Sequence, residues 1–260
     1  MLRPRVTPCL LLSDGQLVKT THFKDPKYVG DPVNAIRIFN EKHADELIVV
    51  DIDATVHGRD PDFALIAKLA SECQMPICYA GGVRNVEHAK RLISIGVEKV
   101  GISSAALNDV NLLSDISTAI GRQSVVGVLD YKKKKSILRS DYYVYTKNGT
   151  QAHKLRLLDV ARQFQVAGVG ELLVNDIDRD GAMQGYNLDV AAQLMEIVTT
   201  PITFLGGAGS LDDISDLVER CGTVGAAAGS LFVFKGRFRA VLINYPTEAE
   251  KETLLRYLPR

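Results

Sequence analysis

The sequence predicts a (β/α)₈ barrel built from two similar half-barrels. Short apolar segments alternate with longer amphipathic segments along the whole chain, as in repeated strand–helix units around a buried parallel sheet. Two motifs also return at a fixed offset of 125 residues. The chain has 260 residues, and barrels of this class typically have about 250. The alternation alone leaves a doubly wound sheet open, and the repeat favours the barrel.

Eight segments have the composition of strands that are buried on both faces. They span residues 5–12, 46–52, 76–80, 99–103, 124–130, 171–176, 201–205 and 224–228. Between them lie stretches with polar faces at helical spacing, which predict helices. The examples are residues 32–42, 62–72, 86–95 and 188–198.

The internal repeat relates the two halves of the chain. Residues 46–53 (ELIVVDID) return as residues 171–178 (ELLVNDID), and residues 76–82 (PICYAGG) return as residues 201–207 (PITFLGG). Either half alone would leave open sheet edges, and no linker rich in proline, serine or glycine separates the halves. We therefore expect one closed domain over residues 1–260.

Composition argues against several classes of function. The chain carries 31 Lys and Arg against 31 Asp and Glu, so no global field attracts nucleic acid or a membrane surface. It has no tryptophan and only 7% aromatic residues, which argues against a stacking platform for nucleic acid. The four cysteines lack CxxC spacing, and the sequence has no apolar signal or transmembrane segment. We expect no metal site, no membrane partner, a cytoplasmic location and local binding of any anion.

Glycine and serine residues follow four of the predicted strands, where the loops of a barrel hold functional groups. Glycine lets the backbone approach an anion closely, and N–H groups that open a short helix can donate to a phosphate. The pattern predicts two phosphate sites on opposite sides of the barrel mouth, and so a substrate with a phosphate at each end. Tight strand–helix turns are the alternative reading. The first site contains Gly82, Ser103 and Ser104, and the second contains Gly207, Gly229 and Ser230.

Carboxylates at the ends of predicted strands are candidates for proton transfer. Asp130 is the strongest, because it ends an apolar strand at the mouth, where partial burial can tune its pKa. A loop cap or an ion-pair partner is the alternative role for each carboxylate. The other candidates are Asp51, Asp176, Asp178 and Asp180.

Four predicted strands begin with a charged residue whose side chain faces the barrel interior, because alternate residues of a strand share a face. These residues are Arg5, Glu46, Lys99 and Glu171. Their charges sum to zero, so they would form a closed ionic ring across the bottom of the barrel. The residues alone favour a structural plug of salt bridges. The inward residues above the ring are small or apolar, which permits a dry axial passage for a neutral molecule.

A set of motifs covers nearly the whole chain. The motifs are SDGQLVK (13–19), GDP (30–32), DEL (45–47), DIDA (51–54), AGG (80–82), Asp130, DIDRDG (176–181), GY (185–186) and GGAG (206–209). With them the sequence resembles the cyclase subunit of imidazole glycerol phosphate synthase, an enzyme of histidine biosynthesis. The resemblance implies a lyase or cyclase subunit of a glutamine amidotransferase complex.

In that family a glutaminase subunit docks on the bottom of the barrel, and ammonia travels through the barrel to a bis-phosphorylated substrate. Ammonia attacks a ribulosyl carbon, water is lost, the imidazole closes and an aminoimidazole carboxamide ribotide is released. The family's gate is a ring of four charged residues that match Arg5, Glu46, Lys99 and Glu171. The resemblance therefore favours a gate over a plug. It implies neither a metal nor an organic cofactor.

The resemblance also assigns roles at the mouth. Asp130 would be the general acid or base, and Lys19, on the loop after the first strand, would fold over the substrate. One phosphate would rest at Gly82 with Ser104, and the other at Gly207 with Ser230. The whole implied set of binding residues is Lys19, Gly82, Ser103, Ser104, Asp180, Gly181, Gly207, Gly229 and Ser230.

One departure from the family changes the expected chemistry. The family has a catalytic aspartate at the end of the first strand, where this chain has Leu11. Leucine cannot transfer a proton, so Asp130 would lack its partner across the mouth. Smaller departures lie nearby, with Ser103 in place of asparagine and Asn175 and Asp176 in place of two hydroxyl residues.

These departures indicate a divergent paralogue. Similar subunits of bacterial surface-polysaccharide pathways are thought to supply ammonia, with a glutaminase-like subunit, to an amidotransferase that makes an acetamidino sugar. Histidine-type cyclisation and ammonia delivery to such a sugar amidotransferase are therefore close rivals. A sugar-phosphate isomerase related by fold ranks last, because it has no use for an ammonia gate.

Overall fold

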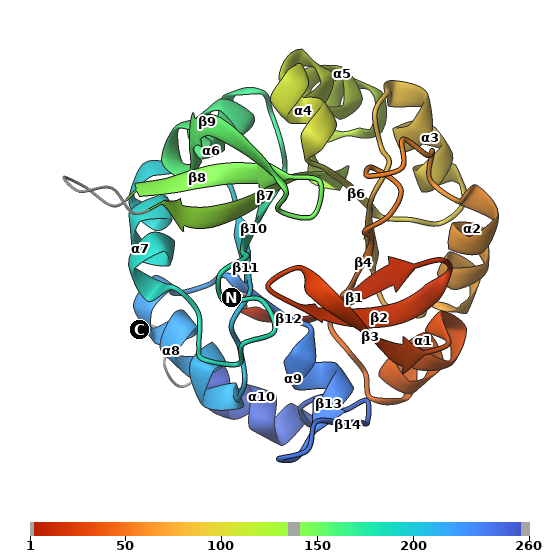
Figure 1. Cartoon of the computed structure of the whole chain (residues 1–260), viewed down its shortest axis with the longest axis vertical. Helices are drawn as coiled ribbons and strands as arrows, with labels where there is room; N and C mark the ends of the chain where they lie inside the picture. Colours follow the sequence, from red (N-terminus) through yellow and green to blue (C-terminus); the bar gives the residue numbers. More distant parts are fainter. Residues whose placement is uncertain (1–2, 135–140, 256–260) are drawn as a thin grey trace.

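A computed structural model describes residues 3–134 and 141–255 as a closed barrel of eight parallel strands surrounded by helices (Figure 1). The barrel strands are β1 (Arg5–Ser13), β4 (Leu47–Asp51), β5 (Ile77–Ala80), β6 (Lys99–Ile102), β7 (Val125–Lys134), β10 (Glu171–Asp176), β11 (Ile202–Leu205) and β12 (Gly225–Ala228). Parallel pairing of β1 with both β12 and β4 closes the sheet. The predicted (β/α)₈ fold is confirmed, and the doubly wound sheet is excluded.

The helices pack against the outside of the barrel in chain order (Figure 1). They are α1 (Pro32–Glu41), α2 (Phe63–Glu72), α3 (Val86–Ser94), α4 (Ser104–Asn108), α5 (Asn111–Ile120), the 3₁₀ turn η1 (Arg122–Ser124), α6 (Leu157–Val166), α7 (Leu188–Ile197), α8 (Leu211–Cys221), α9 (Ser230–Val233) and α10 (Glu248–Leu255). Several begin at a polar cap, as sequence rules expect: the side chains of Asp31, Asn85 and Ser210 accept backbone N–H bonds from the first turns. None of the helices in these ranges is long and apolar enough to cross a membrane.

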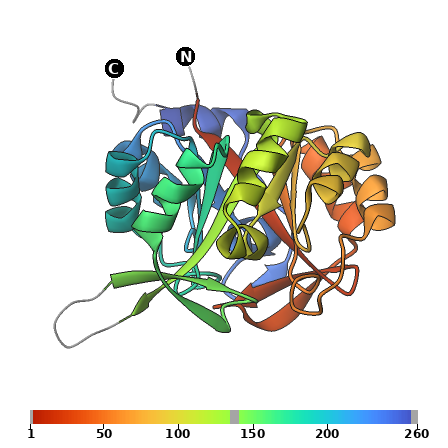
Figure 2. The same cartoon turned by 90° about the horizontal axis from the view of Figure 1, so that it is seen from above.

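The strand predicted to end at Asp130 is longer, and the sequence boundary is wrong. Strand β7 continues to Lys134 and pairs antiparallel with β8 (Asp141–Thr146), which pairs with β9 (Gln151–Arg156). Lys132, Lys133 and Lys134 therefore lie in this strand, and the ammonium group of Lys132 lies over the ring of Tyr145. The extension projects from the end of the barrel opposite to the start of β1 (Figure 2). Its faces are partly exposed, so it carries no apolar run that marks a strand.

A second antiparallel extension follows β1. Strands β2 (Gln16–Thr21) and β3 (Lys24–Gly30) pair with each other, and β2 pairs with β1 after a tight turn at Asp14 and Gly15. The expectation that Lys19 lies on a loop is wrong, because Lys19 lies within β2 and is buried. A short hairpin of β13 (Phe234–Lys235) and β14 (Ala240–Val241) completes the described strands.

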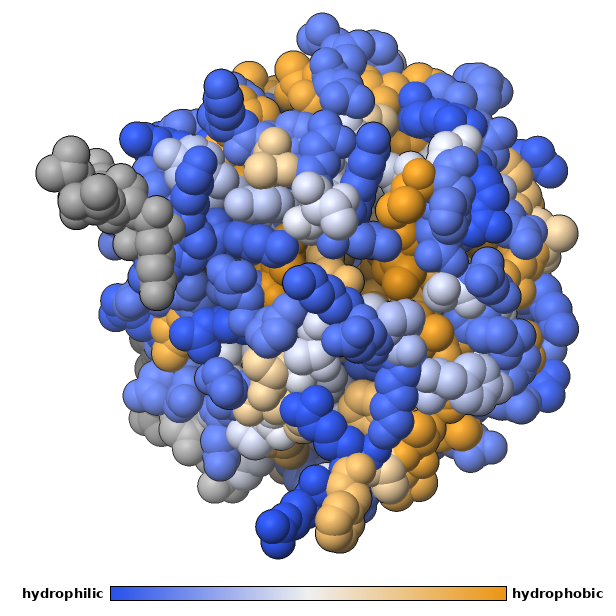
Figure 3. Space-filling model, viewed as in Figure 1, coloured by the Kyte–Doolittle hydropathy of each residue, from blue (hydrophilic) through white to orange (hydrophobic). Residues whose placement is uncertain are grey.

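The apolar residues form two separate layers. The larger layer lies between the sheet and the helices, and contains Phe39, Leu92 and Phe164, none more than 1% exposed. The smaller layer fills the lumen of the barrel, with Cys9, Ile48, Cys78, Val126 and Leu173 among its members. Viewed toward the hairpins, the surface is mostly hydrophilic, with hydrophobic residues visible near its centre (Figure 3).

Tyr245 fastens the segment before α10 to the start of β1. Its hydroxyl donates to the carbonyl of Val6 at 2.7 Å and accepts from the N–H of Asp45 at 3.0 Å. Its ring contacts the rings of Phe39 and Phe232. The contact holds the bottom of the barrel, where Arg5 begins β1.

Replacement Tyr245→Phe should lower the free energy of unfolding by about 1–3 kcal/mol, because it leaves a buried carbonyl and a half-buried N–H without their partner. Urea unfolding measures the change. Tyr28→Phe is the matched control, since the Tyr28 side chain is 61% exposed, and it should change the value by less than about 0.5 kcal/mol. Equal stability of the two variants would show that the hydroxyl of Tyr245 contributes nothing.

Candidate active site

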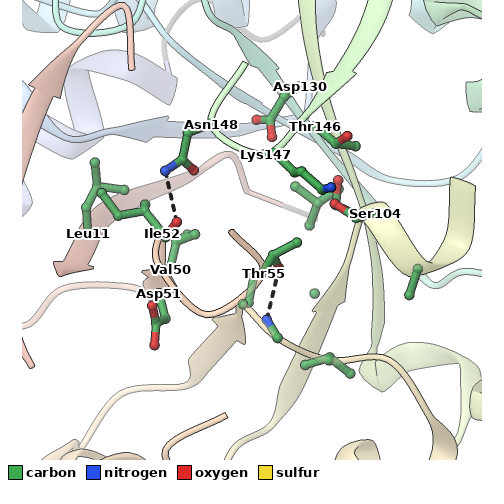
Figure 4. A pocket seen from close by; sticks show the side chains of 18 of the residues that line it. Leu11, Val50, Asp51, Ile52, Thr55, Ser104, Asp130, Thr146, Lys147 and Asn148 are labelled. Carbon is green, nitrogen blue, oxygen red and sulfur yellow. Dashed lines mark hydrogen bonds between the residues drawn. The ribbon is translucent and has the colours of Figure 1, made fainter. Parts of the chain in front are cut away.

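A cavity of about 280 Å³ opens at the carboxyl ends of the barrel strands (Figure 4). Strand ends and the loops after them supply its walls, as in other barrels of this class. Six of the residues that the sequence analysis discussed line this cavity. They are Leu11, Asp51, Gly82, Ser103, Ser104 and Asp130. The structure thus brings the first predicted anion site and the strongest carboxylate candidate to one cavity.

Asp130 lines this cavity with a carboxyl group whose pKa lies well above its ordinary value. Burial raises the pKa of its carboxyl to about 7, and the hydrogen bond that Asn175 Nδ2 donates to Oδ1, 3.0 Å long, opposes the rise. The negative charge of Asp180 adds to it. A carboxyl with a pKa near neutrality can both give and take a proton, which suits acid–base chemistry.

Leu11 lines this cavity, and its side chain has no group that could exchange a proton with Asp130 or with a ligand. Its side chain packs on the apolar residues of the lumen together with Val50. Asp51 is a neighbour, but its Oδ1 accepts the N–H bonds of Asp53 and Ala54, each 2.9 Å long, and its carboxyl points away from Asp130 (Figure 4). The role of Asp51 is therefore to order the loop after β4.

Backbone atoms crowd the first predicted anion site at Gly82. Gly82 has a φ of +70°, and a Cβ at this position would lie 2.8 Å from the carbonyl oxygen of Arg59. Only glycine fits there. The N–H of Gly82 donates to Thr55 Oγ1 at 3.2 Å, and Ser104 begins α4 on the neighbouring strand end. The hydroxyl groups of Thr55 and Ser104 therefore line this side of the cavity, and the N–H of Gly82 is engaged by Thr55.

The second predicted anion site does not line this cavity. The loop after β10 lies against this second site, because the N–H of Gly185 donates to the carbonyl of Gly207 at 2.9 Å. Ser230 is buried, and its hydroxyl has no hydrogen-bond partner among the described residues. A Cβ at Gly229 would lie 2.8 Å from Cε of Lys19, so the lysine side chain covers this position.

Lys19 is held by the same loop. Its Nζ donates to Asp180 Oδ1 at 2.8 Å, and Thr20 Oγ1 donates to the other oxygen at 3.1 Å. Gly181 lies against the backbone of β2, since a Cβ there would be 2.5 Å from the carbonyl oxygen of Thr20. In this arrangement Lys19 is a buried ion-pair partner of Asp180 and is not one of the residues that line the cavity.

The four inward charges lie together at the opposite end of the lumen. Arg5 bonds Glu46 at 2.9 Å and Glu171 at 2.7 Å, and Lys99 bonds the same two carboxylates at 2.6 and 2.8 Å. Each acid thus contacts both bases, and the ring expected from strand parity is closed. Thr203 adds a hydrogen bond to Glu171.

The opposite charges of the ring offset the effect of burial on the pKa values of Arg5, Lys99 and Glu171. Burial alone would raise the pKa of Glu171, but the charges of Arg5 and Lys99 hold it below its ordinary value. Burial acts to lower the pKa of Arg5 and of Lys99, and the two glutamates raise both above their ordinary values. Above the ring the lumen is lined by the apolar layer of Cys9, Ile48 and their neighbours. A ring of charged side chains therefore lies below the apolar side chains that fill the lumen.

Sequence reasoning missed the cavity residues that come from the β8–β9 turn. Lys147 and Asn148 both line the cavity. Asn148 is followed by Gly149, and an Asn-Gly pair between two strand-like segments is a hairpin signal. Reading the pair in this way would have placed a hairpin after Asp130. No group of three or more metal-ligating side chains is arranged for a metal within residues 3–134 and 141–255.

Replacement Asn175→Leu should raise the pKa of Asp130 further above about 7, because the hydrogen bond from Asn175 stabilises the charged carboxylate. Carbon-13 NMR of the carboxyl group across a pH titration measures the value. Asn108→Ala is the control, since Asn108 lines the same cavity but makes no bond to Asp130. An unchanged or lower pKa in the leucine variant would contradict this role of Asn175.

Comparison with known proteins places these features in a family. The model of the histidine biosynthesis protein family matches residues 5–239. A Vibrio vulnificus protein, provisionally named imidazole glycerol phosphate synthase subunit hisF3, is 49% identical over 98% of this chain and 97% of its own. A Pseudomonas aeruginosa protein with the corresponding hisF2 name is 51% identical over 95% and 97%.

A more distant relative carries the subunit name without reservation. The imidazole glycerol phosphate synthase subunit HisF of Exiguobacterium sibiricum is 36% identical over 89% of this chain and 91% of its own. The identity to the provisionally named proteins is higher, which fits a divergent branch. The chain belongs to the histidine biosynthesis protein family and is a relative of the HisF subunit, the cyclase subunit of imidazole glycerol phosphate synthase.

Proposed function

We propose that the chain is a cyclase-type subunit that takes ammonia from a partner glutaminase and passes it to a phosphorylated acceptor at the barrel mouth. The observation that carries the proposal is the closed ring of Arg5, Glu46, Lys99 and Glu171 below an apolar lumen that leads toward Asp130. The whole chain acts as one barrel domain in a cytoplasmic complex.

The ring suits a gate for a small neutral molecule. Charged ammonium would lose its hydration in the apolar lumen, whereas ammonia carries no charge and enters at a lower cost. With all four ion pairs formed, the bottom of the lumen is occupied by side chains. Displacement of Lys99 breaks two pairs at once, so a docked partner that offers Lys99 another contact opens the passage. The glutaminase docks on this face, where the strands begin.

The mouth suits proton transfer next to a bound anion. Asp130 gains or loses a proton near neutral pH, and can accept one from an attacking ammonia or donate one to a departing hydroxyl. Gly82, Ser103 and Ser104 hold one phosphate of the acceptor beside it. Gly207, Gly229 and Ser230 hold the other after the Lys19–Asp180 pair and the Gly185 contact open.

Leu11 favours a second candidate function. Cyclisation of the histidine type uses two carboxylates across the mouth, and this chain has an apolar side chain on one side. On this candidate the barrel mainly conducts ammonia to a separate amidotransferase that forms an amidine on an acetamido sugar. The ring and the apolar lumen serve both candidates, and the fate of ammonia at the mouth separates them.

In the complex with the glutaminase encoded in the same genome, Lys99→Met should uncouple glutamine hydrolysis from ammonia use, because it removes two ion pairs of the ring. The ratio of glutamate formed to nitrogen incorporated stays near one in the parent complex and rises in the variant. Lys90→Met, an exposed change on α3, is the control. If Lys99→Met leaves this ratio unchanged, the ring is a structural plug of salt bridges and not a gate.

With saturating ammonium and no partner, the chain should turn over the phosphoribulosyl substrate of histidine biosynthesis about 100-fold more slowly than the Exiguobacterium sibiricum subunit. The reason is the loss of one proton-transfer group at Leu11. Formation of the aminoimidazole carboxamide ribotide measures the rate, and Asp130→Asn is the negative control. Leu11→Asp should restore part of the rate.

The outcome decides between the two candidates. A rate equal to that of the Exiguobacterium protein would remove the case for delivery to a sugar amidotransferase. Turnover that is absent in both the parent chain and Leu11→Asp would instead remove histidine-type cyclisation.

A further inference from the structure

The turn between β8 and β9 is fixed over the barrel mouth by contacts that are remote in sequence. Asn148 Nδ2 donates to the carbonyl of Ile52, in the loop after β4, at 2.9 Å. Lys132 Nζ donates to the carbonyl of Gly149 at 3.0 Å. The three turn residues 147–149 have positive φ values, between 50° and 70°, which two of them adopt at a cost because they carry side chains. The tethers hold the turn in this conformation.

The turn brings the Lys147 side chain into the cavity wall. Lys147 lines the cavity together with Ser103 and Ser104, and its side chain points toward Ser104 (Figure 4). The lysines that form ion pairs are Lys19, Lys90, Lys99 and Lys251. Within residues 3–134 and 141–255, the Lys147 ammonium therefore has no carboxylate partner.

The other cations of the cavity wall are already engaged. Arg84 forms an ion pair with Asp60 and also donates to the carbonyl of Gly58. Arg59 lies 3.9 Å from Asp53. Among the described residues of the cavity wall, Lys147 is thus the cation that can bind an anion without first breaking an ion pair. The serine hydroxyls beside it are donors of the kind that phosphate accepts.

We propose that Lys147 is a binding residue for a phosphate group of the acceptor, at the end of the cavity formed by Gly82, Ser103 and Ser104. The inference rests on the proposed phosphorylated acceptor and adds a ligand from the hairpin to that site. An ammonium group and an oxyanion form a charge-assisted hydrogen bond, stronger than a bond between neutral groups. The Asn148 tether holds the turn that carries Lys147 at the wall of this cavity.

Titration of the nitrogen-15-labelled chain with inorganic phosphate at low ionic strength tests the proposal. The amide signals of Gly82 and Ser104 report the first site, and those of Gly207 and Ser230 report the second. Lys147→Gln should weaken phosphate binding at the first site about fivefold, the effect of one partly exposed ion pair, and leave the second site unchanged. Lys147→Arg should retain most of the affinity, and added salt should shrink the difference.

Lys154→Gln is the matched control, because it removes the same charge from an exposed position of the same hairpin, on β9. If Lys147→Gln and Lys154→Gln bind phosphate equally at the first site, Lys147 is not a ligand, and the proposed function still stands. If phosphate shifts the amide signals of neither Gly82 nor Ser104 in the parent chain, both the proposed binding of a phosphorylated acceptor and the proposed role of Lys147 are wrong. Unchanged spectra elsewhere in the chain establish that each variant is folded.

Discussion

Closure of the sheet between β1 and β12 is the constraint on which the remaining structure depends. The register that pairs Arg5 with Gly225 and Pro8 with Ala228 removes both sheet edges and creates a lumen. Once the lumen exists, alternate residues of every strand must face it, and the chain has to fill a narrow space with them. Gly225 fits only because it lacks a side chain, since a Cβ there would lie 1.9 Å from Thr203 Oγ1.

That constraint separates the charges of the lumen into two ends. The ring at the bottom is neutral and each of its acids contacts two bases, so burial leaves no member unpaired. Asp130 at the top has an amide as its partner and no base, and burial therefore raises its pKa to about 7. Burial penalises charge at both ends of the lumen: in the ring the paired opposite charges offset this penalty, whereas at Asp130 the penalty raises the pKa.

The hairpins decide what the mouth looks like, and they were the part of the fold that sequence reasoning missed. Strands β3 and β9 are largely exposed, so neither carries the apolar run that marks a barrel strand. As a result Lys19 was expected on a loop and lies in β2, paired with Asp180. Lys147 was not considered, although the turn after β8 brings it to the cavity.

The sequence by itself determined the barrel, the inward faces of its strands and the position of Asp130, because strand alternation and a repeat at 125 residues are local, periodic signals. The resemblance to the cyclase subunit also directed attention to Leu11, where we expect an aspartate in that family. Only the tertiary structure decided which loops meet at the mouth, how Asn175 meets Asp130 and how Asn148 reaches Ile52. Those contacts join residues 45 or more positions apart, and their geometry depends on closure of the whole barrel.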